Sequence, residues 1–174
     1  MVKQVFMKVV IMTLFSLCLN YELKAQAVKE EEELLQLIKH FQQSIVEKDS
    51  VQFMGLFLHD SIPWIGISSA KSWAFHKERR PDINQLEKGS CGGFIRSVVN
   101  YPGRIEEKMF NISIQLDEVM ATLTFDYSFW KDQLPANWGK ESWVILKTNG
   151  QWKIAAVYYS GFNQAVEPTP SHLL

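Results

Sequence analysis

Two polar side chains near the C-terminus are spaced to do acid–base chemistry together. Asn149-Gly150 is a strong signal for a two-residue hairpin turn, and this turn would pair Glu141 with Tyr158 across two antiparallel strands. A half-buried glutamate can act as a general base, and a tyrosine hydroxyl can donate to a developing oxyanion. We therefore predict Glu141 and Tyr158 as candidate catalytic residues. A structural hydrogen bond between them is the alternative.

Four further side chains are candidates for ligand binding. Trp64 and Trp143 could wall an apolar site, and the alternation of its strand would turn Tyr127 inward beside them. His76 opens a basic cluster at 76–80 that could receive an anionic group. Core packing is the alternative explanation for the two tryptophans, and a solvated basic turn is the alternative for the cluster.

Several other chemistries are disfavoured. Asp126 falls on the strand face opposite the apolar residues, which argues against a buried catalytic base there. The four histidines show no metal-ligand spacing, and Cys91 has no evident histidine partner. The sequence contains neither a Gly-rich phosphate loop nor a catalytic triad motif. We expect no metal and no cofactor.

The N-terminus is typical of a secretory signal. Lys3 and Lys8 precede an apolar run of eleven residues over 9–19, which is too short to span a bilayer. Small residues follow, so we predict a signal peptide over 1–25, cleaved after Ala25 or Ala27. The mature protein would then be periplasmic or secreted and would not be bound to a membrane.

Composition favours one globular domain. Removing 25 residues from 174 would leave about 149, with one cysteine and therefore no intramolecular disulfide. The hydrophobic fraction of 47% is enough to build a core without one. The chain lacks a concentrated basic face, so nucleic acid is not an expected partner. We predict a single domain over 26–166 and a flexible tail over 167–174.

Periodicity indicates two helices followed by strands. A helix is expected at 28–48, because Leu34, Ile38 and Phe41 recur at helical spacing, and Asp49 is a candidate N-cap for a second helix at 51–58. Pro63 favours an edge position for the strand predicted at 61–67. The remaining predicted parts are a strand at 61–67, an irregular insert at 66–103 with a short helix at 94–100, and an antiparallel meander at 104–116, 118–131, 139–148 and 151–161.

The meander resembles the SnoaL-like branch of the NTF2-like superfamily. The matching motifs are an alanine-led strand at 121–129, a glycine-led strand at 139–147, the Asn149–Ile154 hairpin and Tyr158-Tyr159-Ser160. The resemblance implies an α+β cone, in which a strongly curved antiparallel sheet packs on N-terminal helices and leaves a pocket at the wide end. It also implies a homodimer that pairs through the outer sheet face.

That superfamily includes isomerases, dehydratases, polyketide cyclases and members without catalysis, so fold alone does not decide the function. The first hypothesis is a protein that binds a small, partly apolar molecule in an aromatic-lined pocket without catalysis. The second is an acid–base enzyme of the isomerase, dehydratase or hydrolase type that uses Glu141 and Tyr158. The third is a protein-interaction module whose outer face carries Val144, Ala155 and Val157.

Overall fold

The computed structural model describes residues 26–174, so the predicted signal peptide at 1–25 lies outside the described residues. The chain divides into two compact units that meet between Gln36 and Leu37. Residues 26–36, the described part of the first unit, are helical. Residues 37–47, at the start of the second unit, are also helical. The second unit holds the rest of the fold and the whole candidate site. Among residues 26–174 no helix is long and apolar enough to cross a membrane.

Two short-range predictions at the start of the second unit are confirmed. Ile38, Phe41 and Ile45 are buried, as their helical spacing predicted. The Asp49 carboxylate accepts hydrogen bonds from the backbone N–H groups of Val51 (3.0 Å) and Gln52 (2.9 Å). This N-cap starts helix α2 (Ser50–Gly55), which is shorter than the sequence predicted.

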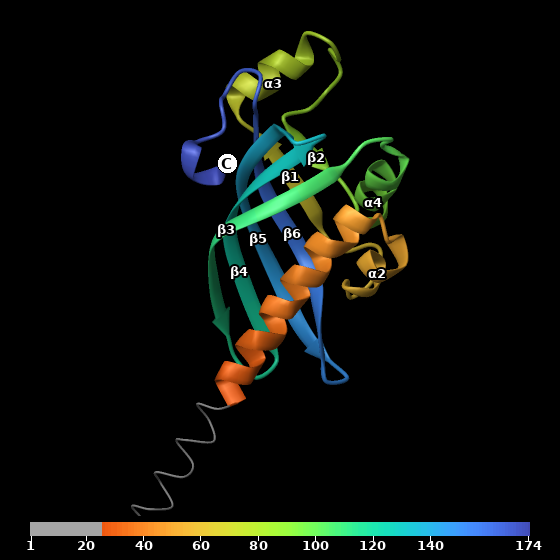
Figure 1. Ribbon diagram of the computed structural model, residues 1–174, viewed down its shortest axis with the longest axis vertical. Helices are drawn as coiled ribbons and strands as arrows, with labels where there is room; N and C mark the ends of the chain where they lie inside the picture. Colours follow the sequence, from red (N-terminus) through yellow and green to blue (C-terminus); the bar gives the residue numbers. More distant parts are fainter. Residues whose placement is uncertain (1–25) are drawn as a thin grey trace, which may run out of the picture. The chain divides into compact units, whose positions relative to one another are not determined.

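The sheet has six strands in the order β2-β1-β6-β5-β4-β3 (Figure 1). The predicted four-stranded antiparallel meander is confirmed, because β3 to β6 pair in sequence order. The fold is α+β, with helices packed on a curved sheet. The strands are β1 (Trp64–Ser68), β2 (Leu86–Lys88), β3 (Ile105–Leu116), β4 (Met120–Lys131), β5 (Leu134–Thr148) and β6 (Gln151–Asn163).

The sheet is mixed rather than wholly antiparallel, and β1 is not an edge strand. It pairs with β6 in parallel and with β2 in antiparallel fashion. Pro63 lies just before β1, so its missing N–H removes no hydrogen bond from the strand. Its carbonyl accepts a hydrogen bond from the N–H of Val157 (2.8 Å). The edge strand on this side of the sheet is β2, which comes from the segment that was predicted to be irregular.

The insert at 66–103 therefore has regular structure. Besides β2 it contains helix α3 (Ala70–Lys77), capped by Ser69, and helix α4 (Cys91–Asn100), capped by Ser90. The predicted helix at 94–100 is the C-terminal part of α4, which buries Cys91, Ile95 and Val98 at helical spacing.

The segment at 167–174, predicted to be flexible, makes defined contacts. The hydroxyls of Ser69 and Ser72 donate hydrogen bonds to the Glu167 carboxylate. A 3₁₀ helix (Ser171–Leu173) follows, and the Ser128 hydroxyl donates to the Leu173 carbonyl (2.7 Å). The chain end thus packs on β4, on the face opposite to Tyr127.

Candidate functional site

A cavity of about 230 Å³ lies between helix α4 and one face of the sheet. We call this face the inner face; it carries the buried side chains of Leu123 and Phe125. Five of the nine lining residues are aromatic and two are glutamates. The lining residues are Trp64, Phe94, Ser97, Glu107, Tyr127, Phe129, Asn137, Glu141 and Tyr159.

Glu141 is a buried carboxyl group at this cavity. Strand alternation places it on the inner face with Trp143, and only 6% of it is exposed. Burial raises the pKa of Glu141 to about 7, because desolvation penalises the charged form. The Trp143 indole N–H donates a hydrogen bond to the carboxylate (2.7 Å) and partly offsets this rise in pKa. Glu141 therefore exchanges its proton near neutral pH.

Glu107 supplies a second buried carboxyl group from strand β3. It is 4% exposed, and its Oε1 atom has no hydrogen-bond partner within residues 26–174. Burial, followed by the charge of Glu141, raises the pKa of Glu107 well above its usual value. Two carboxyl groups thus share one cavity, and their environments favour the protonated form of each.

Two tyrosines complete the polar lining. The Tyr127 hydroxyl donates to the Ser160 carbonyl (2.9 Å), which fixes its ring. The ring of Tyr159 lies over Gly66, where a Cβ atom would come within 2.2 Å of Tyr159 Cζ. Burial, with smaller contributions from nearby glutamates, raises the pKa of Tyr159 to about 12. Both hydroxyls therefore keep their protons near neutral pH.

The predicted pairing of Glu141 with Tyr158 is wrong by one residue. Near the turn the register is as expected, and Ile145 pairs with Ile154. A β-bulge at Ala155 then shifts β6, so that Glu141 pairs with Tyr159. Tyr158 is 44% exposed and points away from the cavity.

The same bulge changes the outer face that the sequence predicted. Val144 pairs with Ala156 instead of Ala155, and Trp143 pairs with Val157. Val157 shares the inner face with Trp143 and is fully buried, so it cannot contribute to an outer docking surface.

The four predicted ligand residues separate into two groups. Trp64 and Tyr127 line the cavity. Trp143 is fully buried and reaches the site through its hydrogen bond to Glu141. His76 lies on α3, where its Nε2 is 3.3 Å from the Asn163 side-chain nitrogen, and it does not line this cavity.

Asp126 points away from the cavity, as strand alternation predicted. Lys140 Nζ lies 2.6 Å from its Oδ1, and Asn111 donates to its Oδ2. The hydrogen bond from Lys140 is the main cause of the lowered pKa of Asp126. A half-buried, salt-bridged carboxylate that points away from the cavity is a poor base for chemistry inside it.

Sequence reasoning missed six lining residues: Phe94, Ser97, Glu107, Phe129, Asn137 and Tyr159. Glu107 had a usable signal, because it lies two residues after the buried Ile105 and so shares its face. Phe94 and Ser97 are three residues apart on α4 and face the same way. Within residues 26–174 no group of three or more His, Cys, Asp or Glu side chains could hold a metal ion.

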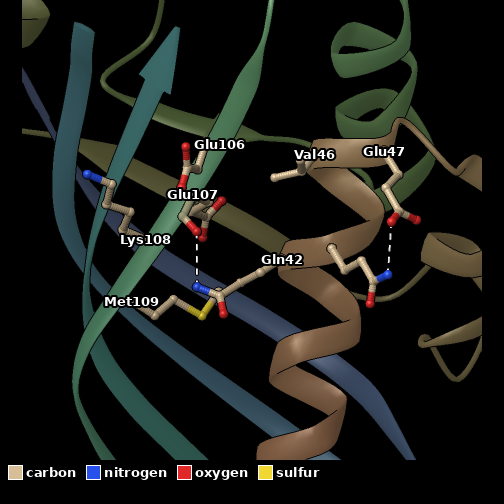
Figure 2. Close-up of a pocket in the computed structure, with 8 residues that line it drawn as sticks. Gln42, Val46, Glu47, Glu106, Glu107, Lys108 and Met109 are labelled. Carbon is tan, nitrogen blue, oxygen red and sulfur yellow. Dashed lines mark hydrogen bonds between the residues drawn. The ribbon is translucent and has the colours of Figure 1, made fainter. Parts of the chain in front are cut away.

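A second cavity, of about 340 Å³, lies within the second unit, between the helical residues at 42–47 and strand β3 (Figure 2). The Gln42 side-chain amide crosses it and donates to the Glu107 carbonyl (3.0 Å). Its lining is mostly polar: Gln42, Gln43, Val46, Glu47, Glu106, Glu107, Lys108 and Met109. Glu107 therefore borders both cavities.

Comparisons with known proteins identify the fold. No family model matches the chain, and no curated protein matches it in sequence. Among solved structures, an NTF2-like protein with a cystatin-like fold from Novosphingobium aromaticivorans is similar, with a TM-score of 0.60, 9% identity, and coverage of 81% of this chain and 87% of that one. An NTF2-like protein of unknown function from Shewanella baltica has a TM-score of 0.54 and 14% identity, covering 78% and 95%.

A third similar structure has a provisional activity. This NTF2-like protein from Streptomyces avermitilis, provisionally assigned as a dehydratase, has a TM-score of 0.55 and 12% identity, covering 78% of this chain and 98% of that one. At such identities the likeness shows the fold alone. The chain has the NTF2-like fold that its sequence motifs implied.

Proposed function

We propose that this protein binds a small, partly apolar molecule in the cavity between α4 and the inner face. Apolar walls with a few convergent polar groups are the usual construction of a ligand site. Its volume of about 230 Å³ is below the roughly 300–1,000 Å³ of drug-sized sites, so the ligand is small.

One observation carries this proposal: the unpartnered oxygen of Glu107 in a cavity with a second buried carboxyl group. A buried polar atom without a partner costs about 1–3 kcal/mol of stability, and more when it is charged. Exceptions of this kind in folded proteins call for an explanation such as a binding or catalytic role. A ligand that hydrogen-bonds Glu107 would supply the missing partner.

Native mass spectrometry of the gently purified protein tests the proposal. We expect a bound small molecule that is retained in a Tyr158→Ala variant and lost in a Tyr159→Ala variant. The two tyrosines are adjacent on β6 but face opposite sides, so the pair controls for general damage to the strand. Equal retention in both variants would contradict the assignment of this cavity.

Acid–base catalysis at the same site is the second candidate, favoured by the pKa of Glu141 near 7. A base works best when its pKa is near the working pH, and Glu107, held protonated by burial, would serve as the acid. In a dehydration, Glu141 would take a proton from carbon while Glu107 gives one to the departing hydroxyl, which leaves as water. The provisional assignment of the Streptomyces protein supports this reaction class.

Glu141→Gln separates catalysis from binding. Once a ligand is identified, we expect this variant to bind it and to lose turnover by about 100-fold or more, whereas the exposed control Glu118→Gln keeps full activity. Wild-type turnover should rise with pH through about 7 as Glu141 loses its proton. Turnover by the glutamine variant at the wild-type rate would exclude Glu141 as the base.

The proposed setting is periplasmic or secreted, with a homodimer formed through the outer sheet face. The signal-like sequence at 1–25 supports the compartment. The outward-facing Val144 supports the dimer surface.

A further inference from the structure

The cavity has negative and aromatic groups but no basic one. None of its nine lining residues, all within the described chain, is lysine, arginine or histidine. Two are buried glutamates, and five are aromatic. This composition restricts the charge of a ligand more sharply than the volume does.

The lysines next to the two glutamates in sequence are both turned away from them. Lys108 follows Glu107, but its Nζ lies 3.6 Å from the Trp130 ring centroid and donates to the Leu174 carbonyl. Lys140 precedes Glu141 and pairs with Asp126. Neither lysine neutralises the carboxyl pair.

The aromatic walls are suited to a positive charge. The Trp64 and Phe94 rings stack at a centroid distance of 5.4 Å, and Phe94 meets Phe129 edge-on at 6.0 Å. Aromatic faces carry negative potential and attract ammonium groups, most strongly where water is excluded. An anion would meet aromatic side chains and two carboxyl groups, with no cationic partner among the nine lining residues.

We propose that the ligand is a small organic cation, a protonated or quaternary amine, held by the carboxylates of Glu107 and Glu141 within the aromatic walls. This inference rests on the proposed function of the cavity as a ligand site. Glu107 supplies the second observation beside the acidic pair, because it is 4% exposed, lines the cavity and has an Oε1 atom without a hydrogen-bond partner within residues 26–174.

Proton release should accompany binding. In the free protein the two carboxyl groups favour their protonated forms, and a bound cation favours the carboxylate. The other titratable groups near the pair are Tyr127 and Tyr159, and both tyrosines keep their protons near neutral pH. Glu87 lies close enough to the two tyrosines to raise the pKa of each. Affinity for a cation should therefore rise with pH through about 7, as Glu141 loses its proton.

Three probes that share one ring and differ in charge test this inference. Benzylammonium, benzyl alcohol and benzoate are titrated into the full-length protein by calorimetry from about pH 6 to about pH 8, where benzylamine stays protonated. We expect benzylammonium to bind about tenfold or more tightly than benzyl alcohol, with proton release in buffers of differing ionisation enthalpy. Benzoate should not bind.

Glutamine variants assign the preference to the carboxyl pair. The double variant Glu107→Gln, Glu141→Gln should bind benzylammonium no more tightly than benzyl alcohol, and its affinity should not depend on pH. The single variant Glu118→Gln should change neither property. Benzyl alcohol binding as tightly as benzylammonium would overturn the cation inference and leave the ligand cavity standing. Failure of both probes to bind the wild-type protein would count against the cavity itself and therefore against both proposals.

Discussion

At the scale of single residues, Glu107 and Glu141 dominate the account because burial makes both reluctant to ionise. Their pKa values are raised above those of an unfolded chain, so the folded state holds the protons more tightly. For Glu141, tighter proton binding in the folded state contributes stability that is fully present below about pH 4.5. This contribution is lost as the pH rises through about 7. These residues therefore oppose folding at alkaline pH.

Glu107→Gln should stabilise the protein at about pH 8, by about 1–3 kcal/mol, because the unfolded chain ionises Glu107 at that pH whereas the fold disfavours its charged form, and the amide removes this cost. At about pH 5 the change should be much smaller, since the carboxyl group is then already neutral. Urea unfolding at the two pH values measures the difference. Glu106→Gln, the neighbour on β3, should show no such pH-dependent gain, and an equal gain from it would refute the explanation.

The sequence identified half of the acidic pair. Glu141 stood out because a clear hairpin turn fixed its strand. Glu107 did not, because β3 breaks its own alternation: its register shifts between Phe110 and Ser113, and Asn111 has a positive φ of 51°. The buried Ile105, two residues before Glu107, did indicate its inward direction, but the interrupted alternation later in the strand obscured that signal.

At the scale of elements, the β6 bulge decides which tyrosine enters the cavity. Turn chemistry sets the register beside Asn149-Gly150, but it does not reach past Ala155. Nothing in a two-residue turn encodes an extra residue several positions away. Only the structure could therefore show that Tyr159, and not Tyr158, faces the cavity. The parallel pairing of β1 with β6 is likewise a long-range feature that local patterns do not contain.

Gly66→Ala tests how β1 holds Tyr159. A Cβ atom at Gly66 would overlap the Tyr159 ring, so we expect the ring to move, ligand binding to weaken and stability to fall by about 1–3 kcal/mol. Thermal unfolding and ligand titration measure the two effects. Gly55→Ala is the matched control, because no atom lies within 4 Å of its added Cβ. Unchanged ligand binding in the Gly66→Ala variant would show that the position of the Tyr159 ring over Gly66 is not needed for binding.

At the scale of the whole molecule, the chain end is part of the folded second unit. Leu173 is 2% exposed, whereas the adjacent Leu174 is 54% exposed. The prediction of a loose tail relied on Pro168 and Pro170, which mark irregular backbone without saying whether it packs. Apolar motifs in the strands were enough to predict the NTF2-like fold, but they carried no information about the contacts of this segment.

Leu173→Ala should lower the free energy of unfolding by about 2–3 kcal/mol, because it removes a buried side chain from a packed site. Leu174→Ala should change it by less than about 0.5 kcal/mol. Urea denaturation of the two variants beside the wild-type protein makes the comparison. Equal and small effects would show that the C-terminal segment does not contribute to stability.

The central claim is that Glu107 and Glu141 form a buried, proton-holding pair in one cavity. Carbon-13 NMR of the side-chain carboxyl carbons, followed as a function of pH, measures this directly. We expect Glu141 to titrate near pH 7 and Glu107 to titrate well above the usual value for glutamate. Titration of both groups near the unperturbed value of about 4.3 would show that the carboxyl groups are solvated, and would contradict the account.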